Sequence, residues 1–309
     1  MREVERAEWD SLEGLDAYYR RPYVEAAALL DRGRPFLLEH EGAVFAGVER
    51  EGPRDVVTPY GYGGPVGDGG FWPAYEEWAR ERGVVTTFVR FHPLYANHRE
   101  APIYVEQLAQ TVAWRVEEGR DLLAGLHWKH RNKVRKAENA GATVTAAQGL
   151  GGFVELYEDT MRRVNASGFY FFEPAYWEAL ERLGEGLVRF DATIGGEVAA
   201  SALCLASPPW LHYHLSGTTD SGRSTGASTL VLLEAARWAQ GEGYERFHLG
   251  GGLGGKQDSL HHFKARFDPE GLVDAAVGKA IHDEDAYRSL SGGEAGFEGF
   301  FPAYRAPSG

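Results

Sequence analysis

The most constraining stretch of this chain is a short apolar run that ends in glycines. The run Phe247 to Leu249 has the composition of a buried strand, and five of the six residues after it are glycine. Glycine is favoured where the backbone needs a positive φ or where another group must approach it closely. Farther along, Phe263 is followed by Lys264. The pattern predicts a strand end that forms the floor of a substrate site, with Gly250, Gly251 and Phe263 beside the substrate.

The length and composition of the chain predict two α/β domains with substantial apolar cores. A chain of 309 residues exceeds one average domain, and 43% of its residues are hydrophobic. No apolar run reaches the ~18 residues of a membrane-spanning helix. The charged start MREVERAEWD also lacks the apolar stretch of a signal peptide. We therefore expect a cytoplasmic protein without stable membrane insertion.

The cysteine and histidine content predicts neither a disulfide nor a bound metal. The single cysteine, Cys204, lies in an apolar run that is typical of a buried thiol. No Cys/His spacing is typical of a zinc site. His212 and His214 would face the same side of a predicted strand, yet no carboxylate stands at a suitable spacing beside them.

Alternating strand and helix signals predict a mixed α/β fold in both halves of the chain. β-branched and apolar runs predict strands over residues 43–49, 84–91, 111–116, 143–147, 187–194, 198–206 and 210–215. Amphipathic periodicity predicts helices over residues 71–82, 121–139, 152–165, 174–183 and around 230–239. The segment rich in Gly, Ser and Thr after Leu215 predicts a loop.

Four motifs follow one another along the chain in a distinctive order and spacing. They are the loop 59–65 (PYGYGGP), the strand end 89–94 (VRFHPL), the basic run 131–137 (RNKVRKA) and the block 211–267 with Phe263-Lys264 near its end. Together they resemble the Fem-type aminoacyltransferases, which belong to the superfamily with the N-acetyltransferase (GNAT) fold. The resemblance extends from about residue 60 to residue 267.

The resemblance implies two tandem GNAT-like domains and transfer of an acyl group to a primary amine. The first domain would comprise residues 1–140, completed by the C-terminal tail 271–309, and the second residues 141–270. Some relatives insert a long coiled-coil arm, but this chain has no heptad pattern of sufficient length. We therefore expect a compact member without that arm.

A local basic cluster, KHRNKVRK, stands out in a chain whose net charge is −13. The overall charge disfavours attraction of nucleic acid or anionic lipid to the whole molecule. On a helix the cluster is either a solvated face near the helix end or a phosphate contact. The phosphate would belong to a tRNA acceptor end or to a diphosphate on the acceptor substrate. The candidate residues are Lys129, Arg131, Lys133, Arg135 and Lys136.

The first half contains candidates for substrate binding and for proton transfer. The loop 59–65 and the adjacent strand end either line the cleft that the resemblance places here or only turn a corner. Its candidate residues are Tyr60, Gly61, Gly63, Gly64 and Arg90. Members of the family often have a carboxylate where this chain has His92. His92, whose ordinary pKa is near ~6.5, is therefore the candidate base, and the alternative is a structural histidine in a turn.

Two further motifs distinguish the possible acyl donors. The resemblance places Lys264 in the channel for the tRNA end, where its ammonium would stabilise an oxyanion or neutralise a phosphate. Tyr213 is a candidate substrate-binding residue in the same block. The turn Arg223 to Ser228 resembles the pyrophosphate loop of coenzyme A-dependent acetyltransferases, although Ser stands at its last position. Such a turn offers backbone N–H groups to phosphate, with Arg223 as a further phosphate ligand.

The combined prediction is an aminoacyltransferase that moves an amino acid from aminoacyl-tRNA to a primary amine. By resemblance, the acceptor is a UDP- or lipid-linked muramyl peptide of peptidoglycan, and the product is an interpeptide bridge. Because the donor ester is already activated, positioning and oxyanion stabilisation suffice, and we expect no cofactor. The alternatives are a coenzyme A-dependent N-acyltransferase and a non-catalytic binding module that retains the fold.

Overall fold

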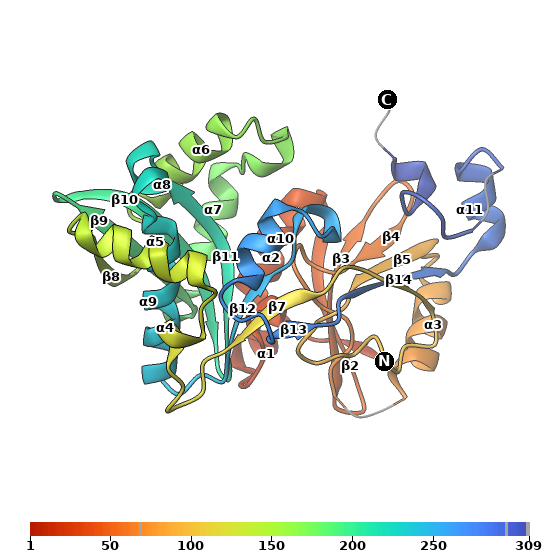
Figure 1. Cartoon of the computed structure of the whole chain (residues 1–309). Coiled ribbons are helices and arrows are strands. Elements are labelled where there is room, and N and C mark those ends of the chain that lie inside the picture. The colour runs from red at the N-terminus through yellow and green to blue at the C-terminus, as the bar shows by residue number, and fades with distance from the viewer. Residues whose placement is uncertain (68–69, 294–295, 307–309) are drawn as a thin grey trace. The chain divides into compact units, whose positions relative to one another are not determined.

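The chain folds into two compact units (Figure 1). The first contains Met1–Leu108 and Asp274–Gly309, and the second contains Ala109–Val273. The computed structural model describes residues 1–67, 70–293 and 296–306. Each unit is built around a seven-stranded mixed sheet with helices packed on it. The predicted mixed α/β class with two halves is therefore confirmed.

The sheet of the first unit takes one inner strand from the far end of the chain. Its strand order is β1 (Arg2–Glu3), β2 (Arg34–His40), β3 (Ala43–Arg50), β4 (Asp55–Val57), β5 (Thr86–Arg90), β14 (Ala276–Ile281) and β6 (Tyr104–Gln107). Strands β4 and β5 pair in parallel, and their neighbours pair antiparallel. Because β14 lies between β5 and β6, the C-terminal segment is part of this sheet.

Aromatic side chains join the helices of the first unit to its sheet. The helices are α1 (Arg6–Ser11), α2 (Arg21–Asp31), α3 (Phe71–Glu81) and α11 (Glu284–Leu290), with 3₁₀ turns at Ala17–Tyr19 and Ala303–Arg305. Helix α3 buries Phe71, Tyr75 and Trp78, which recur at helical spacing and so share one face. That face meets Phe36 and Phe45 of the sheet, and the Phe45 and Tyr75 ring centroids are 5.3 Å apart.

The second unit has its own seven-stranded sheet. Its strand order is β13 (Leu272–Val273), β7 (Thr111–Arg115), β12 (Arg246–Gly250), β11 (Trp210–Thr218), β10 (Glu197–Ser207), β9 (Leu187–Ile194) and β8 (Thr143–Gln148). Its helices are α4 (Leu122–Gly125), α5 (Trp128–Asn139), α6 (Phe153–Arg163), α7 (Pro174–Glu181), α8 (Asp220–Thr225), α9 (Ala227–Gly241) and α10 (Ser259–Ala265). Short 3₁₀ turns lie at Gly168–Tyr170, Gly184–Gly186 and Leu253–Gly255. Helix α9 is buried along most of its length between the sheet and α5.

Both sheets have the same order of parallel and antiparallel strand pairs, although the sequence shows no repeat. In each, three antiparallel steps lead to a strand, β4 or β11, that pairs in parallel with β5 or β12. A helix, α3 or α9, lies between the parallel strands in the chain. Two more antiparallel strands complete each sheet. The similarity of the two halves therefore lies in strand order rather than in local sequence.

The structure differs from the expected boundaries in two places. The units divide after Leu108 rather than after residue 140, because β7 pairs with β12 and β13, and α5 packs on α9. The helix expected over residues 121–139 is two helices. The break occurs where Leu126 is extended and the His127 side chain accepts the N–H of Lys129, which caps α5.

The helices do not include a membrane span. Within the described residues, none is long and apolar enough to cross a bilayer.

Candidate active site

The parallel strands of the second sheet remain paired over only three residues. Pairing of β11 with β12 ends at His212 and His248. Strand β11 then continues to Thr218 along β10, whereas β12 turns away at Gly250. Gly250 has a φ of 75°, which disfavours any side chain. The positive φ of Gly250 therefore lets β12 turn away from β11. The predicted substrate contact of Gly250 and Gly251 stays a prediction.

The ammonium group of Lys264 lies where these strands separate. Its Nζ donates to the Gly251 carbonyl at 2.8 Å and lies 5.5 Å from the ring centroid of Tyr213, the first β11 residue after the pairing ends. Lys264 is only 8% exposed. Burial lowers the pKa of Lys264 to about 8, and the negative charge of Asp258 opposes that shift. Among the described residues, its other two N–H donors have no hydrogen-bond acceptor, and no carboxylate pairs with it.

Asp258 holds the segment that presents Lys264. Its carboxylate accepts the N–H of His261 at 2.9 Å, which caps α10, and the N–H of Leu253 at 3.0 Å. Gly252 is required in this turn because a Cβ there would lie 2.2 Å from the Lys256 carbonyl oxygen. The helix and the turn below it are thereby fixed to each other. Sequence reasoning missed Asp258, although an Asp three residues before the capped N–H is a helix-start signal.

Tyr213 and Phe263, two other candidates in residues 211–267, differ from each other in their surroundings. The Tyr213 hydroxyl is hydrogen-bonded to Ser216, and burial raises the pKa of Tyr213 to about 12, so the phenol stays protonated. The ring of Phe263 packs against His130 and Phe267, at centroid distances of 5.0 and 5.4 Å. Tyr213 therefore lies beside Lys264, whereas Phe263 joins α10 to α5. A direct substrate contact of Phe263 stays a prediction.

Helix α5 carries the basic cluster on its exposed side. His130, Val134 and Ala137 are buried, and the His130 Nε2 lies 2.9 Å from the Phe263 carbonyl oxygen. Burial lowers the pKa of His130 to about 4, so this ring is neutral near pH 7. Four exposed cations have no carboxylate within ion-pair distance in the described part of the chain: Lys129, Lys133, Arg135 and Lys136. Arg131 instead donates to the carbonyl groups of Leu126 and Ala124 and caps the end of α4.

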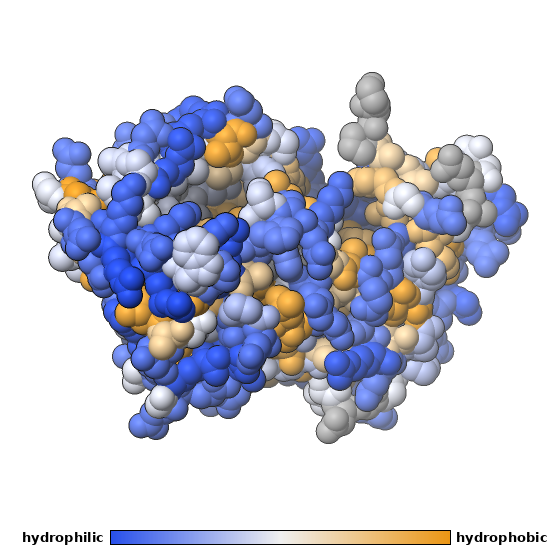
Figure 2. Space-filling view, viewed as in Figure 1, coloured by the Kyte–Doolittle hydropathy of each residue, from blue (hydrophilic) through white to orange (hydrophobic). Residues whose placement is uncertain are grey.

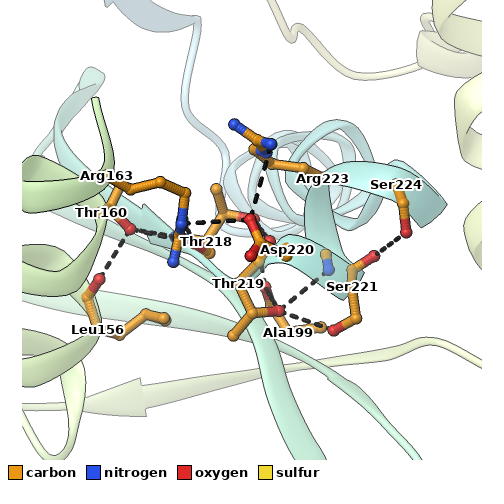
Figure 3. A network of polar contacts seen from close by, with 11 residues as sticks. Leu156, Thr160, Arg163, Ala199, Thr218, Thr219, Asp220, Ser221, Arg223 and Ser224 are labelled. Carbon is orange, nitrogen blue, oxygen red and sulfur yellow. Dashed lines mark hydrogen bonds and ion pairs between the residues drawn. The ribbon is translucent and has the colours of Figure 1, made fainter. Parts of the chain in front are cut away.

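The turn that resembles a pyrophosphate loop begins in a short helix, α8, where several backbone N–H groups are engaged (Figure 3). The Thr219 hydroxyl accepts the N–H of Gly222 at 3.0 Å. The Arg223 and Gly226 N–H groups donate to the carbonyl groups of Thr219 and Gly222. These donors are therefore not available to a phosphate. The expected loop after Leu215 is wrong here, because Thr219 caps helix α8.

The side chains around this turn are also occupied by protein groups. The Arg223 guanidinium lies 3.6 Å from the Asp220 carboxylate, which also lies 3.2 Å from Arg163 (Figure 3). A Cβ on Gly226 would lie 2.8 Å from the Lys133 carbonyl oxygen, so the backbone of α5 covers the turn. The Arg223 side chain is 58% exposed, so Asp220 competes with a phosphate for it but does not block it.

The glycines of the loop 59–65 in the first unit have packing roles. Gly61 has a φ of 107° and faces the Tyr18 ring, and Gly64 has a φ of 92° and faces Asn97. Gly63 joins the loop to the neighbouring strand, since its N–H donates to the Arg90 carbonyl at 2.7 Å. These packing contacts account for the glycines without any substrate. A contact between the glycines and a substrate stays a prediction.

Tyr60 and Arg90 belong to the same corner of the first unit. The Tyr60 carbonyl accepts the Tyr23 hydroxyl at 2.5 Å. The Arg90 guanidinium donates to the Thr58 carbonyl at 2.9 Å and stacks over the Phe88 ring, 5.0 Å from its centroid. Burial lowers the pKa of Arg90. The structure thus brings the first-unit candidates together around the end of β5.

His92 is enclosed in the first unit. Its Nδ1 accepts the N–H of Tyr95 at 3.3 Å, and its Nε2 lies 3.6 Å from the Asp16 carboxylate. The rings of Tyr18 and Tyr62 pack around it, with centroid distances of 5.9 and 6.1 Å. The buried pair of His92 and Asp16 matches the alternative that His92 is a structural histidine in a turn. Its role as the base stays a prediction.

His212 and His214 do not act as a pair. Strand β11 has an irregularity opposite Cys204, with His214 as the extra residue, so the expected alternation is interrupted. The His212 ring packs against that of His248, with a centroid distance of 5.7 Å, whereas His214 is hydrogen-bonded to the Tyr176 hydroxyl at 2.8 Å.

Comparison with known proteins identifies the fold. Residues 128–265 match the family described as an acetyltransferase (GNAT) domain. The crystal structure of FemX is similar with a TM-score of 0.68 and 14% identity, covering 94% of this chain and 99% of that chain. L-PGS from Bacillus licheniformis gives a TM-score of 0.59 at 14% identity, with 90% of each chain covered.

A further solved structure has the same fold. It is the C-terminal domain of a candidate lysylphosphatidylglycerol synthetase from Agrobacterium fabrum, with a TM-score of 0.57 and 18% identity, covering 89% of this chain and 94% of that chain. No curated protein sequence matches this chain. At these identities the structural similarity concerns the fold, so substrate and mechanism have to be argued from this chain's own residues.

Proposed function

We propose that this chain, whose residues 128–265 match an acetyltransferase (GNAT) domain and whose fold is similar to that of FemX, is an acyltransferase that transfers an amino acid from aminoacyl-tRNA to a primary amine. The observation that carries the proposal is the position of Lys264. Its ammonium is buried where β11 and β12 separate, and within the described residues it has two unused N–H donors and no paired carboxylate, which suits an oxygen that becomes negatively charged.

The proposed reaction needs no covalent intermediate on the protein. The neutral amine attacks the ester carbonyl, a C–N bond forms, and the carbonyl oxygen becomes an oxyanion that Lys264 stabilises. When the tetrahedral intermediate collapses, the C–O ester bond breaks and the ribose oxygen takes up the proton that the amine loses. Positioning and stabilisation of the oxyanion account for the catalysis, because the ester is already activated.

The choice of donor is supported by the difference between the exposed side of α5 and the turn at Arg223. The exposed cations of α5 have no carboxylate partner in the described residues, so they are available to the phosphates of an RNA. The coenzyme A alternative requires the turn at Arg223. The N–H groups of Gly222, Arg223 and Gly226 are hydrogen-bonded within this turn, and the Lys133 carbonyl lies over Gly226. The observations therefore favour a tRNA donor.

The proposed acceptor is the amine of a UDP- or lipid-linked muramyl peptide in the cytoplasm. This choice follows from the resemblance to Fem-type enzymes. Tyr60 and Arg90 are the first-unit residues that we assign to it, because Arg90 is a desolvated cation. The negative charge of Asp31 acts on Arg90, but no carboxylate among the described residues forms an ion pair with it. We propose no cofactor.

The test is transfer of radiolabelled amino acid from a pool of charged tRNA to UDP-linked muramyl pentapeptide, with acetyl-CoA as a parallel donor. Label on the pentapeptide that disappears after ribonuclease treatment supports the proposal, whereas label from acetyl-CoA alone overturns the choice of donor.

The Lys264→Met variant tests the role of the ammonium. We expect transfer to fall roughly 10²- to 10³-fold, the usual effect of removing an oxyanion donor. Lys256→Ala is the matched control, since Lys256 is exposed in the same turn. Equal activity of Lys264→Met and the wild type would exclude Lys264 from catalysis.

A further inference from the structure

An exposed tryptophan stands at the start of the basic helix. Trp128 is 55% exposed, although tryptophan is usually well buried in folded proteins. It lies outside the buried stripe of α5, which is formed by His130, Val134 and Ala137. The direction of its side chain is therefore set by the helical spacing and not by the core. Sequence reasoning did not consider this residue.

The surroundings of Trp128 are cationic. The Lys129 Nζ lies 5.5 Å from the centroid of its ring, and the ring of His127 lies 5.7 Å away. From Lys129 to Lys136 the exposed cations cover about 10 Å of helix. Figure 2 shows mainly hydrophilic residues over α5. Partial burial, and to a smaller extent the positive charge of Arg266, lower the pKa of Lys133.

An aromatic ring among cations without carboxylate partners has the chemistry of a single-stranded nucleic acid site. The cations attract the phosphates, and the ring face stacks on a base. A duplex would supply the phosphates but no unstacked base. Anionic lipid would also supply phosphates to the cations but no base for the ring, and the net charge of −13 opposes both kinds of ligand outside this cluster.

This surface is connected to the candidate catalytic lysine through α10. The Lys133 Nζ lies 5.7 Å from the centroid of the Phe263 ring, and the His127 N–H donates to the Arg266 carbonyl at 2.9 Å. Phe263 precedes Lys264, whose side chain extends to Gly251. A strand held on α5 would therefore have its end close to Lys264.

We propose that Trp128 is a stacking platform for an unpaired base near the 3′ end of the donor RNA, with Lys129 and Lys136 holding the adjoining phosphates. The choice of RNA rests on the proposed function, whereas the stacking role rests on the exposure and surroundings of Trp128.

The test is binding of two fluorescein-labelled RNA hairpins, one with a short single-stranded 3′ overhang and one with a blunt end, measured by anisotropy. We expect Trp128→Ala to weaken binding of the overhang hairpin roughly 5- to 100-fold, the usual effect of losing one stacked base, and to leave the blunt hairpin unchanged. Trp128→Phe should retain most of the binding. Phe300→Ala is the matched control, since Phe300 is 54% exposed in the first unit.

The lysine variants separate phosphate contacts from stacking. Replacing Lys129 and Lys136 by alanine should weaken both hairpins and reduce the dependence of affinity on salt. If the Trp128→Ala variant binds the overhang hairpin as tightly as the wild type does, the proposal is overturned. Loss of binding to phosphatidylglycerol vesicles in Trp128→Ala, with RNA binding retained, would assign the surface to lipid instead.

The two proposals can fail independently. Overhang binding that depends on Trp128, without any transfer from charged tRNA, would contradict the proposed function and support the stacking role. Transfer that is unaffected in Trp128→Ala, together with unchanged overhang binding, would contradict the stacking role only.

Discussion

At the scale of single residues, the environment of Lys264 determines its charge. A lysine ordinarily keeps its proton far above neutral pH, but burial lowers the pKa of Lys264 to about 8. Asp258 limits this shift while it also caps the helix that carries Lys264. The group therefore remains protonated near pH 7, as oxyanion stabilisation requires, and it loses its proton as the pH rises through about 8.

Asp258→Asn is expected to move the loss of the Lys264 proton to lower pH. The substitution removes the negative charge that raises the pKa of Lys264, whereas the asparagine oxygen can still accept the N–H of His261. The bend in the profile of kcat/KM against pH should shift to lower pH, and the fold should be kept. A uniform loss of activity without a shift would show that Asp258 only supports the helix.

At the scale of elements, Gly226 at the junction between α8 and α9 matches the pyrophosphate-loop motif in sequence but serves helix packing in the structure. Gly226 has a φ of 91° and lies under the Lys133 carbonyl. In the resembling pyrophosphate loops this glycine would let phosphate approach, whereas here it lets α5 approach. The glycine is thus required for the packing of α5 and not for the binding of a ligand.

Gly226→Ala and Arg223→Ala should therefore have different effects. Gly226→Ala should lower the free energy of unfolding by about 2 kcal/mol, because both the positive φ and the nearby Lys133 carbonyl disfavour a Cβ. Arg223→Ala should change stability by less than ~0.5 kcal/mol, since its ion pair with Asp220 is exposed. Urea titrations and the transfer assay give both results. Abolished transfer in Arg223→Ala would restore the phosphate-loop hypothesis.

At the scale of the whole molecule, the C-terminal segment belongs to the first unit. Strand β14 lies inside that sheet, and Tyr287 and Phe301 form a small core with Val85. Near the chain end, the Arg305 guanidinium donates to the Asp55 carboxylate at 2.9 Å and to the Pro53 carbonyl at 2.7 Å. Each unit has its own core, so we expect local stability to differ between the two units.

Arg305→Ala tests this division. The variant leaves the fully buried Asp55 carboxylate with fewer partners, and we expect the free energy of unfolding of the first unit to fall by about 1 to 3 kcal/mol. Hydrogen exchange should become faster in β3, β4 and β5 but not in β10 and β11. Arg237→Ala is the control, since Arg237 pairs with exposed Glu234 in the second unit. Equal acceleration in both units would contradict the assignment.

Local patterns in the sequence determined many of the elements and the position of the candidate lysine. The strand expected over residues 43–49 is β3, and the helix expected over 71–82 is α3. Alternation and helical periodicity act within a few residues, so one segment carries the whole signal. The glycine-rich strand end and the basic run could be recognised in the sequence for the same reason, whereas the residues that contact them could not.

Only the tertiary structure decided how these elements combine and what surrounds the site residues. The position of β14 between β5 and β6 depends on pairing with strands more than 160 residues away. Helix α8 forms in a segment whose composition predicts a loop, because Thr219 caps it and donates to the distant Ala199 carbonyl. The burial of Lys264 and the cover over Gly226 likewise come from segments that are remote in sequence. Such contacts leave no local pattern, since their energy depends on groups that folding alone brings together.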